Sequence, residues 1–327
     1  MTEKLFLKTA LTEDLLLVDG LARAGKMVTS KLVSHMEGIE FIQVREPVDQ
    51  VPMLYGLGQF DAASAGAFLR MQLDVAIHDR AIGRNLNLRV SDGTTLLNAP
   101  DLAEFTRRAE EPSDAAALAQ FLESGLVPFF FTHQAMPFMS LFFDIAANLK
   151  VLEVVRHPVT LAASWYRRGW GERWSTDPRV FTVMADRGGH AIPWFALDWA
   201  DEFLEGAPMD RVLRSVLELI RACDDGVAGL TGPQQDSILF VPYERLICET
   251  DAMIGEISGF LGVRPGNTID QVCNRENLPK TMQSKTLSES LALIERHGSQ
   301  DLVEQLLGVA KSYEEKWGFT SALAGSL

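Results

Sequence analysis

The sequence predicts an α/β protein built around a doubly wound sheet of about five parallel strands, with helices on both faces. Two observations support this fold class. Short apolar runs alternate with segments of helical periodicity, and most of these runs are continuous, as in parallel strands that are covered on both faces. The chain has 327 residues, which is enough for one large domain with an extensive core.

Strands and helices are expected to follow one another along the chain. The strands are predicted at Asp14–Asp19, Glu40–Arg45, Val127–His133, Lys150–Arg156 and Ser237–Glu244. The helices are predicted at Gly25–Met36, Ala65–Asp79, Ser113–Leu122, Pro137–Asn148, Pro158–Arg168, Met209–Val227, Ile247–Leu261 and Gln300–Trp317. Two longer stretches, residues 48–112 and 169–208, are interpreted as helical insertions in a single domain of residues 1–327.

Composition limits the classes of function. The net charge of −14 argues against nucleic-acid binding, which requires clustered Lys and Arg. The cysteines Cys223, Cys248 and Cys273 are too widely spaced for a CxxC metal site, and their odd number argues against a disulfide framework. No signal peptide and no apolar stretch of membrane-spanning length is recognised, so a cytoplasmic location is expected. Neither a metal nor a particular oligomeric state is predicted.

A glycine loop follows the first predicted strand. In the sequence LLLVDGLARAGKMVTSK, a strand runs into Gly20 and a helix begins near Gly25. The backbone N–H groups of such a loop can bind phosphate, and Arg23 and Lys26 add positive charge. The spacing from Gly20 to Lys26 fits G-x-x-x-x-G-K, but Met27 stands where an ATPase has the hydroxyl group that holds magnesium. The loop is therefore predicted to bind phosphate without a metal.

A second motif follows a later strand. The sequence KVLEVVRHPVTLAASWYRR places Arg156 at the carboxyl end of this strand, and Ser164 falls about two turns along the next helix. Open α/β sheets bind ligands at this end of their strands. An arginine can hold a phosphate through two parallel hydrogen bonds, and a nearby serine hydroxyl group can add a third.

A third motif, FFFTHQAMP, places His133 after another predicted strand. His133 should therefore lie at the same edge of the sheet as the glycine loop and Arg156. An imidazole can take a proton from an attacking hydroxyl group at neutral pH, so His133 is the predicted general base. Glu46, which follows the second predicted strand, is the alternative base.

The three motifs resemble those of the P-loop-type sulfotransferase superfamily. In that family, an Arg at a strand end, then Pro, then Ser eight residues after the Arg, bind the 3′-phosphate of the cofactor, and Arg156, Pro158 and Ser164 match this pattern. The cytosolic members also have a Thr-His pair like Thr132-His133, in which the histidine is the base. The late sequences YERL and FLG are similar to the family as well, so the resemblance extends roughly over residues 15–263.

The resemblance implies an enzyme that moves a sulfuryl group from 3′-phosphoadenosine 5′-phosphosulfate (PAPS) to an acceptor hydroxyl group by in-line transfer, releasing 3′-phosphoadenosine 5′-phosphate (PAP). His133 would be the base, and Lys26 and Arg23 would stabilise the transferring group. The residues expected to bind the cofactor are Gly20, Arg23, Ala24, Gly25, Lys26, Met27, Arg156 and Ser164, with Lys280 and Lys285 as weaker candidates.

The sequence departs from the family at two places. Phe131 replaces the lysine that precedes the Thr-His pair, so Lys26 or Arg23 would have to supply that charge. The Arg-Lys-Gly triplet that touches the 3′-phosphate in the family is missing, and Lys280 and Lys285 are the nearest basic residues to its place.

Two alternative functions stay open. A P-loop kinase or ATPase would need a magnesium-binding hydroxyl group after Lys26 and an aspartate at a strand end. A noncatalytic nucleotide-binding relative would keep the fold without turnover, as Met27 and Phe131 suggest.

The acceptor has no readable signature, and a sugar, a lipid-like alcohol or a phenol fits equally, because acceptor pockets are formed by variable loops. Aromatic faces suit sugars or apolar rings, but core packing is expected for at least half of the tryptophans in residues 169–208, which are Trp170, Trp174, Trp194 and Trp199.

Overall fold

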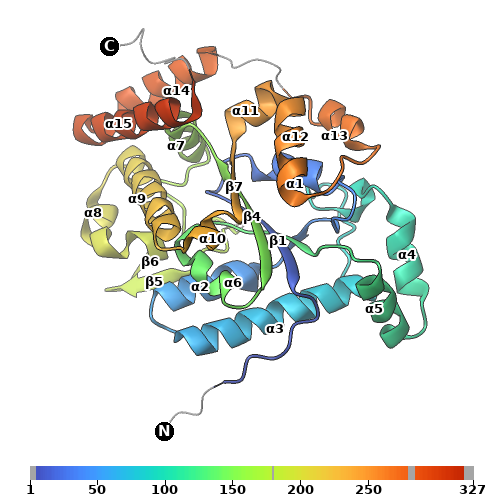
Figure 1. Ribbon diagram of the computed structural model, residues 1–327. Helices are drawn as coiled ribbons and strands as arrows, with labels where there is room; N and C mark the ends of the chain where they lie inside the picture. Colours follow the sequence, from blue (N-terminus) through green and yellow to red (C-terminus); the bar gives the residue numbers. More distant parts are fainter. Residues whose placement is uncertain (1–4, 179, 279–283, 320–327) are drawn as a thin grey trace.

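The computed structural model describes residues 5–178, 180–278 and 284–319, without the side chains of Ser284 and Lys285. At its centre lies a sheet of five parallel strands in the order β2-β3-β1-β4-β7 (Figure 1). Each strand overlaps its predicted range, and the predicted fold class is confirmed. The strands are β1 (Asp14–Asp19), β2 (Gln43–Val44), β3 (Phe129–Phe131), β4 (Asn148–Val155) and β7 (Ile238–Pro242).

Helices surround this sheet (Figure 1). The first half of the chain contributes α1 (Lys26–Val33), α2 (Glu46–Gly56), α3 (Ala62–Ala81), α4 (Leu102–Glu110), α5 (Asp114–Glu123), α6 (Met139–Phe143) and α7 (Pro158–Arg167). The second half contributes α8 (Ala200–Glu205), α9 (Pro208–Ala228), α10 (Gly232–Gln235), α11 (Tyr243–Cys248), α12 (Thr250–Leu261), α13 (Ile269–Arg275), α14 (Ser284–His297) and α15 (Gln300–Trp317). A separate antiparallel hairpin consists of β5 (Met184–Arg187) and β6 (His190–Pro193).

The central strand β1 is apolar on both faces. Leu15 and Leu17 pack on the side of α3 and α6, whereas Leu16 and Val18 pack on the side of α1 and α12. All four side chains are buried, and the burial of each stabilises the fold by about 1.5–3 kcal/mol. Because β1 is held between β3 and β4, the loop that follows it emerges between the segments that follow those two strands.

A third apolar cluster joins α7, α9, α14 and α15 beside the sheet. Trp165 of α7 is fully buried at its centre, and the rings of Trp170 and Trp174 each contact it edge-on with centroids 5.2 Å away. Trp199 is buried as well, while Trp194 is only partly buried. The expectation that at least half of the tryptophans in residues 169–208 belong to the core is therefore confirmed.

Two predicted helices differ from the structure. The range Pro137–Asn148 was too long, since α6 ends at Phe143 and Asn148 already belongs to β4. The range Ile247–Leu261 is divided between α11 and α12, because Glu249 has a non-helical backbone with φ −120° and ψ 43°. Within the predicted insertion, α2 begins at Glu46 directly after β2, which places its first turn at the carboxyl edge of the sheet.

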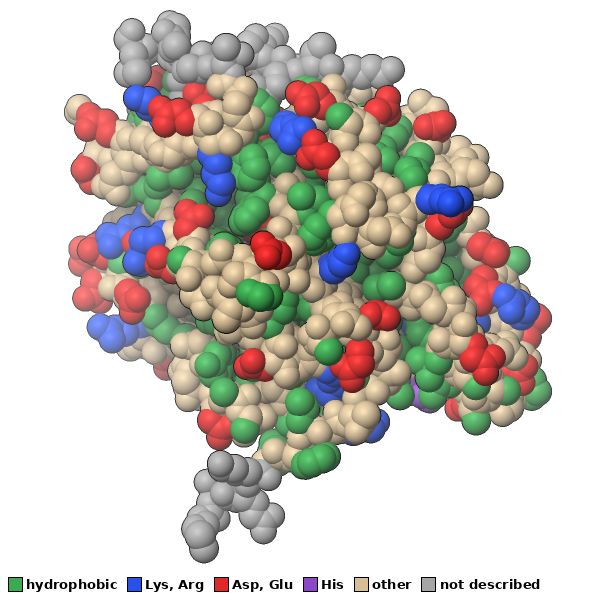
Figure 2. All heavy atoms as spheres, viewed as in Figure 1, with side chains coloured by type: hydrophobic (Ala, Val, Ile, Leu, Met, Phe, Trp, Pro, Cys, Tyr) green, Lys and Arg blue, Asp and Glu red, His purple; other side chains and the backbone are tan. Residues whose placement is uncertain are grey.

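The surface agrees with an acidic protein. Figure 2 shows acidic side chains spread over the face in view, with Lys and Arg side chains between them. Within the ranges that the structure describes, no helix combines the length and the hydropathy needed to cross a membrane.

Substitution of Gly20 by alanine is predicted to destabilise the fold. Gly20 has a φ of 138°, and a Cβ atom there would lie 2.3 Å from the carbonyl oxygen of Val154 on β4. The backbone strain alone should lower the free energy of unfolding by about 1–3 kcal/mol, measured by urea denaturation. As a control, Gly255→Ala in α12 faces open space and should stabilise by up to about 1 kcal/mol. Equal responses of the two variants would contradict the close contact between the loop and β4.

Candidate functional site

The glycine loop connects β1 to α1 and has an unusual backbone. Gly20, Arg23 and Gly25 all have positive φ values, of 138°, 70° and 111°. Gly25 precedes the first residue of α1, and no side chain caps this helix terminus. A Cβ atom on Gly25 would lie 2.2 Å from the ring of Tyr243, so only glycine fits there. The loop thus presents the N-terminus of α1 without a capping side chain, as a phosphate-binding loop does.

Arg156, Arg23 and Ser164 lie together beside this loop. Arg156 follows β4 and donates from Nη1 to the carbonyl oxygen of Arg23 at 2.9 Å. Arg23 in turn donates from Nε to Oγ of Ser164 at 3.3 Å. The guanidinium of Arg156 also lies over the ring of Tyr243, 5.0 Å from its centroid, and burial lowers the pKa of this arginine. Three residues that the sequence assigns to the cofactor site are therefore in one cluster.

Lys26 points away from this cluster, into the protein. Its Nζ donates to the carbonyl oxygen of Gly20 and lies 5.1 Å from the centroid of the Phe131 ring. Only 2% of Lys26 is exposed, and this burial lowers its pKa, whereas the carboxylates of Asp19 and Asp49 favour its charged form. In this conformation Lys26 neutralises buried acids, and Arg23 is the exposed cation of the loop.

Ala24 and Met27 have different surroundings. Ala24 is buried in the apolar cluster on the α1 side of the sheet. Met27 is directed toward the segment that follows α3, since a Cβ atom on Gly93 would lie 2.9 Å from Met27 Sδ. Met27 therefore lines a cavity next to the loop. Of the weaker candidates, Lys280 lies outside the described residues, as does the side chain of Lys285.

Two buried carboxyl groups lie beneath the loop. Asp19 of β1 and Glu153 of β4 are partners in the sheet register, and both are almost completely buried. Burial raises the pKa of Glu153 well above its ordinary value, and the neighbouring Asp19 raises it further. Asp19 accepts hydrogen bonds from Thr132 Oγ1 at 3.0 Å and from the backbone N–H of Met136 at 2.9 Å. Glu153 is therefore the group that retains a proton, and Asp19 is the hydrogen-bond acceptor.

His133 is held by a carboxylate that the sequence did not indicate. Asp49, in the first turn of α2, accepts from Nδ1 of His133 through Oδ2 and from its backbone N–H through Oδ1, both at 2.8 Å. The imidazole packs edge-on against Phe131 with centroids 4.7 Å apart, and 38% of the His133 side chain is exposed. Because Nδ1 donates its hydrogen bond to Asp49, Nε2 is the nitrogen that can act on a substrate.

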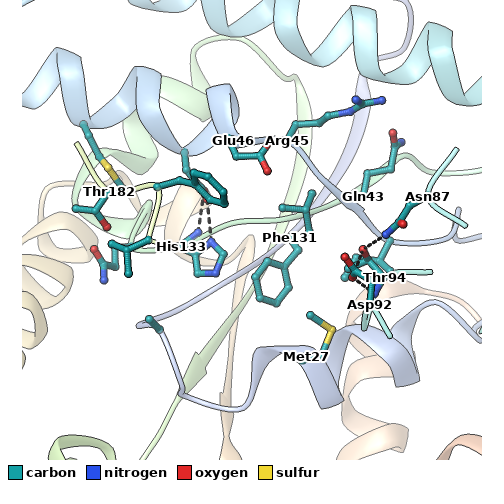
Figure 3. Close-up of a pocket in the computed structure, with 18 of the residues that line it drawn as sticks. Met27, Gln43, Arg45, Glu46, Asn87, Asp92, Thr94, Phe131, His133 and Thr182 are labelled. Carbon is teal, nitrogen blue, oxygen red and sulfur yellow. Dashed lines mark hydrogen bonds and ion pairs between the residues drawn. The ribbon is translucent and has the colours of Figure 1, made fainter. Parts of the chain in front are cut away.

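His133 lies on the wall of a cavity of about 530 Å³ at the carboxyl ends of β2 and β3. In Figure 3, His133, Glu46 and Phe131 lie around its centre, while Asn87, Asp92 and Thr94 lie on a neighbouring loop. The lining residues are Ala22, Met27, Ile42, Gln43, Val44, Arg45, Glu46, Asp49, Met53, Arg80, Asn85, Asn87, Asp92, Thr94, Phe131, His133, Gln134, Trp170, Trp174, Val180, Phe181 and Thr182. Both predicted bases, His133 and Glu46, thus line one cavity.

The segment that carries His133 and the glycine loop are linked through the backbone. The N–H of Gln134 donates to the carbonyl oxygen of Gly20 at 3.2 Å, and Gln134 adopts the left-handed conformation with φ 57°. A non-glycine residue in that region is uncommon and is frequently associated with a functional site. The segment after β3 and the segment after β1 therefore form one continuous edge.

Comparison with known proteins identifies the family of the chain. A model of the sulfotransferase domain matches residues 128–317, which is more than half of the chain. The chain therefore belongs to the sulfotransferase domain family, a family of transferases that use PAPS. The matched part contains β3, β4 and β7, whereas the glycine loop and Asp49 precede it.

Among solved structures, the chain is similar to two sulfotransferase domains of larger biosynthetic systems. The domain from the curacin biosynthetic pathway is 10% identical with a TM-score of 0.45, over 79% of this chain and 77% of that one. The domain of the Synechococcus PCC 7002 olefin synthase is 14% identical with a TM-score of 0.46, over 91% and 94%.

A mouse sulfotransferase, SULT7A1, complexed with PAP, is 11% identical with a TM-score of 0.35, over 80% and 64%. A comparison with curated protein sequences gave no match.

Replacement of Glu153 by glutamine is predicted to stabilise the protein increasingly as the pH rises. The pKa of Glu153 is raised in the folded chain, so the folded chain retains a proton that the unfolded chain releases above its ordinary pKa of 4.5. The free energy of unfolding of the wild type should therefore fall with rising pH in that range, and Glu153→Gln should remove this loss.

Urea denaturation at several values between about pH 5 and pH 8 measures the effect. Glu123→Gln on the exposed face of α5 is the matched control and should leave the pH dependence unchanged. If the free energy of unfolding of the wild type rose with pH, and Glu153→Gln had the same pH dependence, Glu153 would be ionised in the folded protein.

Proposed function

We propose that the chain transfers a sulfuryl group from PAPS to a hydroxyl group of a small acceptor, with His133 as the general base. The observation that carries this proposal is the position of the His133–Asp49 pair. It lies on the wall of a cavity whose edge is joined to the glycine loop by the hydrogen bond from Gln134 to Gly20. Base and donor-binding loop are thus adjacent, as direct in-line transfer requires.

The residues present fit a phosphorylated nucleotide donor. Arg156 and Ser164 would hold the 3′-phosphate, and the loop from Gly20 to Met27 would hold the 5′-phosphosulfate. The donors are the backbone N–H groups at the uncapped start of α1 and the guanidinium groups of Arg23 and Arg156. When bound, the cofactor supplies the sulfuryl group and a phosphate leaving group.

Asp49 determines which form of His133 is available. Its carboxylate accepts a hydrogen bond from Nδ1–H, so the neutral imidazole has its lone pair on Nε2, the nitrogen left for the acceptor hydroxyl group. Nε2 accepts the proton of the acceptor hydroxyl group while the oxygen attacks sulfur. The imidazolium that forms is stabilised by the same carboxylate 2.8 Å away. Glu46 lines the same cavity without such an orienting partner among the described residues, which favours His133 as the base.

Arg23 is the cation best placed to stabilise charge at the transferring group. It is exposed on the glycine loop, whereas Phe131 occupies the position of the family lysine and Lys26 is bonded to Gly20. Lys26 would contact the donor only if its Nζ gave up the hydrogen bond to the carbonyl oxygen of Gly20 and bonded a phosphosulfate oxygen instead. The kinase or ATPase alternative is disfavoured, because the residue after Lys26 is Met27, a thioether on the cavity wall in place of a hydroxyl group.

Arg156→Ala is predicted to weaken PAP binding at least tenfold without any added metal. The variant removes a half-buried cation from the cluster with Arg23 and Ser164, and a charge-assisted hydrogen bond contributes about 1.5–3 kcal/mol. Isothermal calorimetry with PAP, and separately with ATP and magnesium, measures the effect. Arg221→Ala on the exposed surface of α9 is the control. Tight binding of ATP with magnesium in place of PAP would overturn the donor assignment.

Asp49→Asn is predicted to lower kcat by about 10²-fold or more while leaving the affinity for PAP unchanged. The amide has one acceptor oxygen and no negative charge, so it cannot accept both hydrogen bonds from His133 or stabilise the imidazolium as the carboxylate does. Transfer from PAPS to a mixed panel of alcohols, phenols and sugars, followed by mass spectrometry, measures the rate.

The double variant Asp49→Asn/His133→Ala should be no slower than His133→Ala, because the two residues act as a unit. Asp251→Asn on α12 is the matched control. Loss of activity in Glu46→Gln, with full activity in Asp49→Asn, would instead identify Glu46 as the base.

A further inference from the structure

The cavity beside His133 contains buried hydrogen-bonding groups without protein partners. The side chain of Gln43, at the carboxyl end of β2, is 4% exposed, and within the described chain neither its Nε2 nor its Oε1 has a partner. Gln134 is 2% exposed, and its Oε1 likewise lacks a partner among the described residues. Buried polar groups are nearly always bonded in folded proteins, so two such amides on one cavity wall need an explanation.

Further unpaired groups on the same wall are donors. Nη1 of Arg80 and the indole Nε1 atoms of Trp170 and Trp174 are buried without a partner among the described residues. The wall therefore has unmatched donors together with the unmatched acceptors Gln43 Oε1 and Gln134 Oε1. A hydroxyl group both donates and accepts hydrogen bonds, whereas a carboxylate only accepts. A phenol or a sterol alcohol has only its reacting hydroxyl group to form hydrogen bonds with these unpaired groups.

The charges on the wall disfavour an anionic acceptor. Glu46, Asp49 and Asp92 line the cavity, and of the two lining arginines Arg45 is paired with an acid. Arg45 lies 3.7 Å from Asp79, and Arg80 donates to the carbonyl oxygen of Ile42 at 3.2 Å. An acceptor with carboxylate, phosphate or sulfate groups would meet more acidic side chains than unpaired basic side chains in this cavity.

The two amides are carried by segments adjacent to His133. Gln134 directly follows His133, and its left-handed backbone and its hydrogen bond to Gly20 fix it between the base and the glycine loop. Gln43 lies on β2, which pairs with the strand that leads to His133. The cavity also has mixed polar and apolar walls, which match the hydroxyl groups and the C–H faces of a sugar ring.

We infer that the acceptor is an uncharged, polyhydroxylated molecule of saccharide character, and that Gln43 and Gln134 determine this specificity. The inference rests on the proposed sulfuryl transfer. It selects one class among the alcohols, phenols and sugars that the sequence leaves open.

The acceptor class is tested by transfer from PAPS to three matched sets, with sulfated products detected by mass spectrometry. Methyl glucoside, methyl galactoside and lactose represent neutral polyols, 4-nitrophenol and a sterol represent apolar alcohols, and glucuronic acid represents anionic sugars. Turnover should be confined to the neutral polyols. With PAP binding intact by calorimetry, turnover of the other sets only, or of none, would overturn the inference. Failure of PAP binding itself would instead overturn the proposed function.

The two amides are tested by Gln43→Met and Gln134→Met, which keep the side-chain length and remove the polar atoms. Each should raise the KM for the preferred polyol about tenfold, the effect of one lost hydrogen bond, and leave PAP affinity unchanged. The Tm should not fall, because no hydrogen bond to the protein is lost. Gln271→Met, on the exposed surface of α13, is the control. A KM equal to that of the wild type in both variants would show that these amides do not recognise the acceptor.

Discussion

The carboxylate of Asp19 connects the two halves of the site. It lies at the end of β1, immediately before the glycine loop, and accepts hydrogen bonds from Thr132 and from the N–H of Met136 on either side of His133. Register and apolar burial bring β1 and β3 together, but they do not fix how the segments beyond the strand ends are oriented. The buried Asp19 supplies that constraint, because leaving either donor unpaired in the interior would cost about 1–3 kcal/mol. His133 and the glycine loop are thereby held in one relative position.

This constraint has an electrostatic consequence beneath the loop. Burial raises the pKa of Asp19, and Lys26 opposes that effect by lying nearby. Burial raises the pKa of Glu153 well above its ordinary value, and the positive charge of Lys26 favours the ionised form of Asp19. The inward lysine is therefore explained by the acids below it. Among the residues that the structure describes around the loop, Arg23 and Arg156 are the cations left for anionic ligands, and they lie together in a chain with a net charge of −14.

The sequence predicted the parts of the site that depend on strand ends. Arg156, His133 and the glycine loop each follow a continuous apolar run, so a parallel sheet necessarily brings them to one edge. Asp49 escaped prediction because its partner is 84 residues away and it lies in a helix that was taken for part of an insertion. The only available signal was a second acid, three residues after Glu46, in the first turn after a strand. The inward direction of Lys26 depends on the buried acids Asp19 and Glu153, which have no pattern of their own in the sequence.

The site residues that the sequence predicted are those proposed to bind the sulfuryl donor. The residues that it did not predict line the cavity proposed for the sulfuryl acceptor. The residues proposed to bind the donor lie at the end of β4, in the loop between β1 and α1, and in the first two turns of α1 and α7, where backbone geometry restricts the choice of residue. The acceptor cavity is lined largely from the two stretches taken as insertions, residues 48–112 and 169–208, and its chemistry arises only when they fold over β2 and β3. Gln43 illustrates the difference. In the sequence it is one polar residue at the end of a short strand, and only the closed cavity shows that both ends of its amide lack a partner among the described residues.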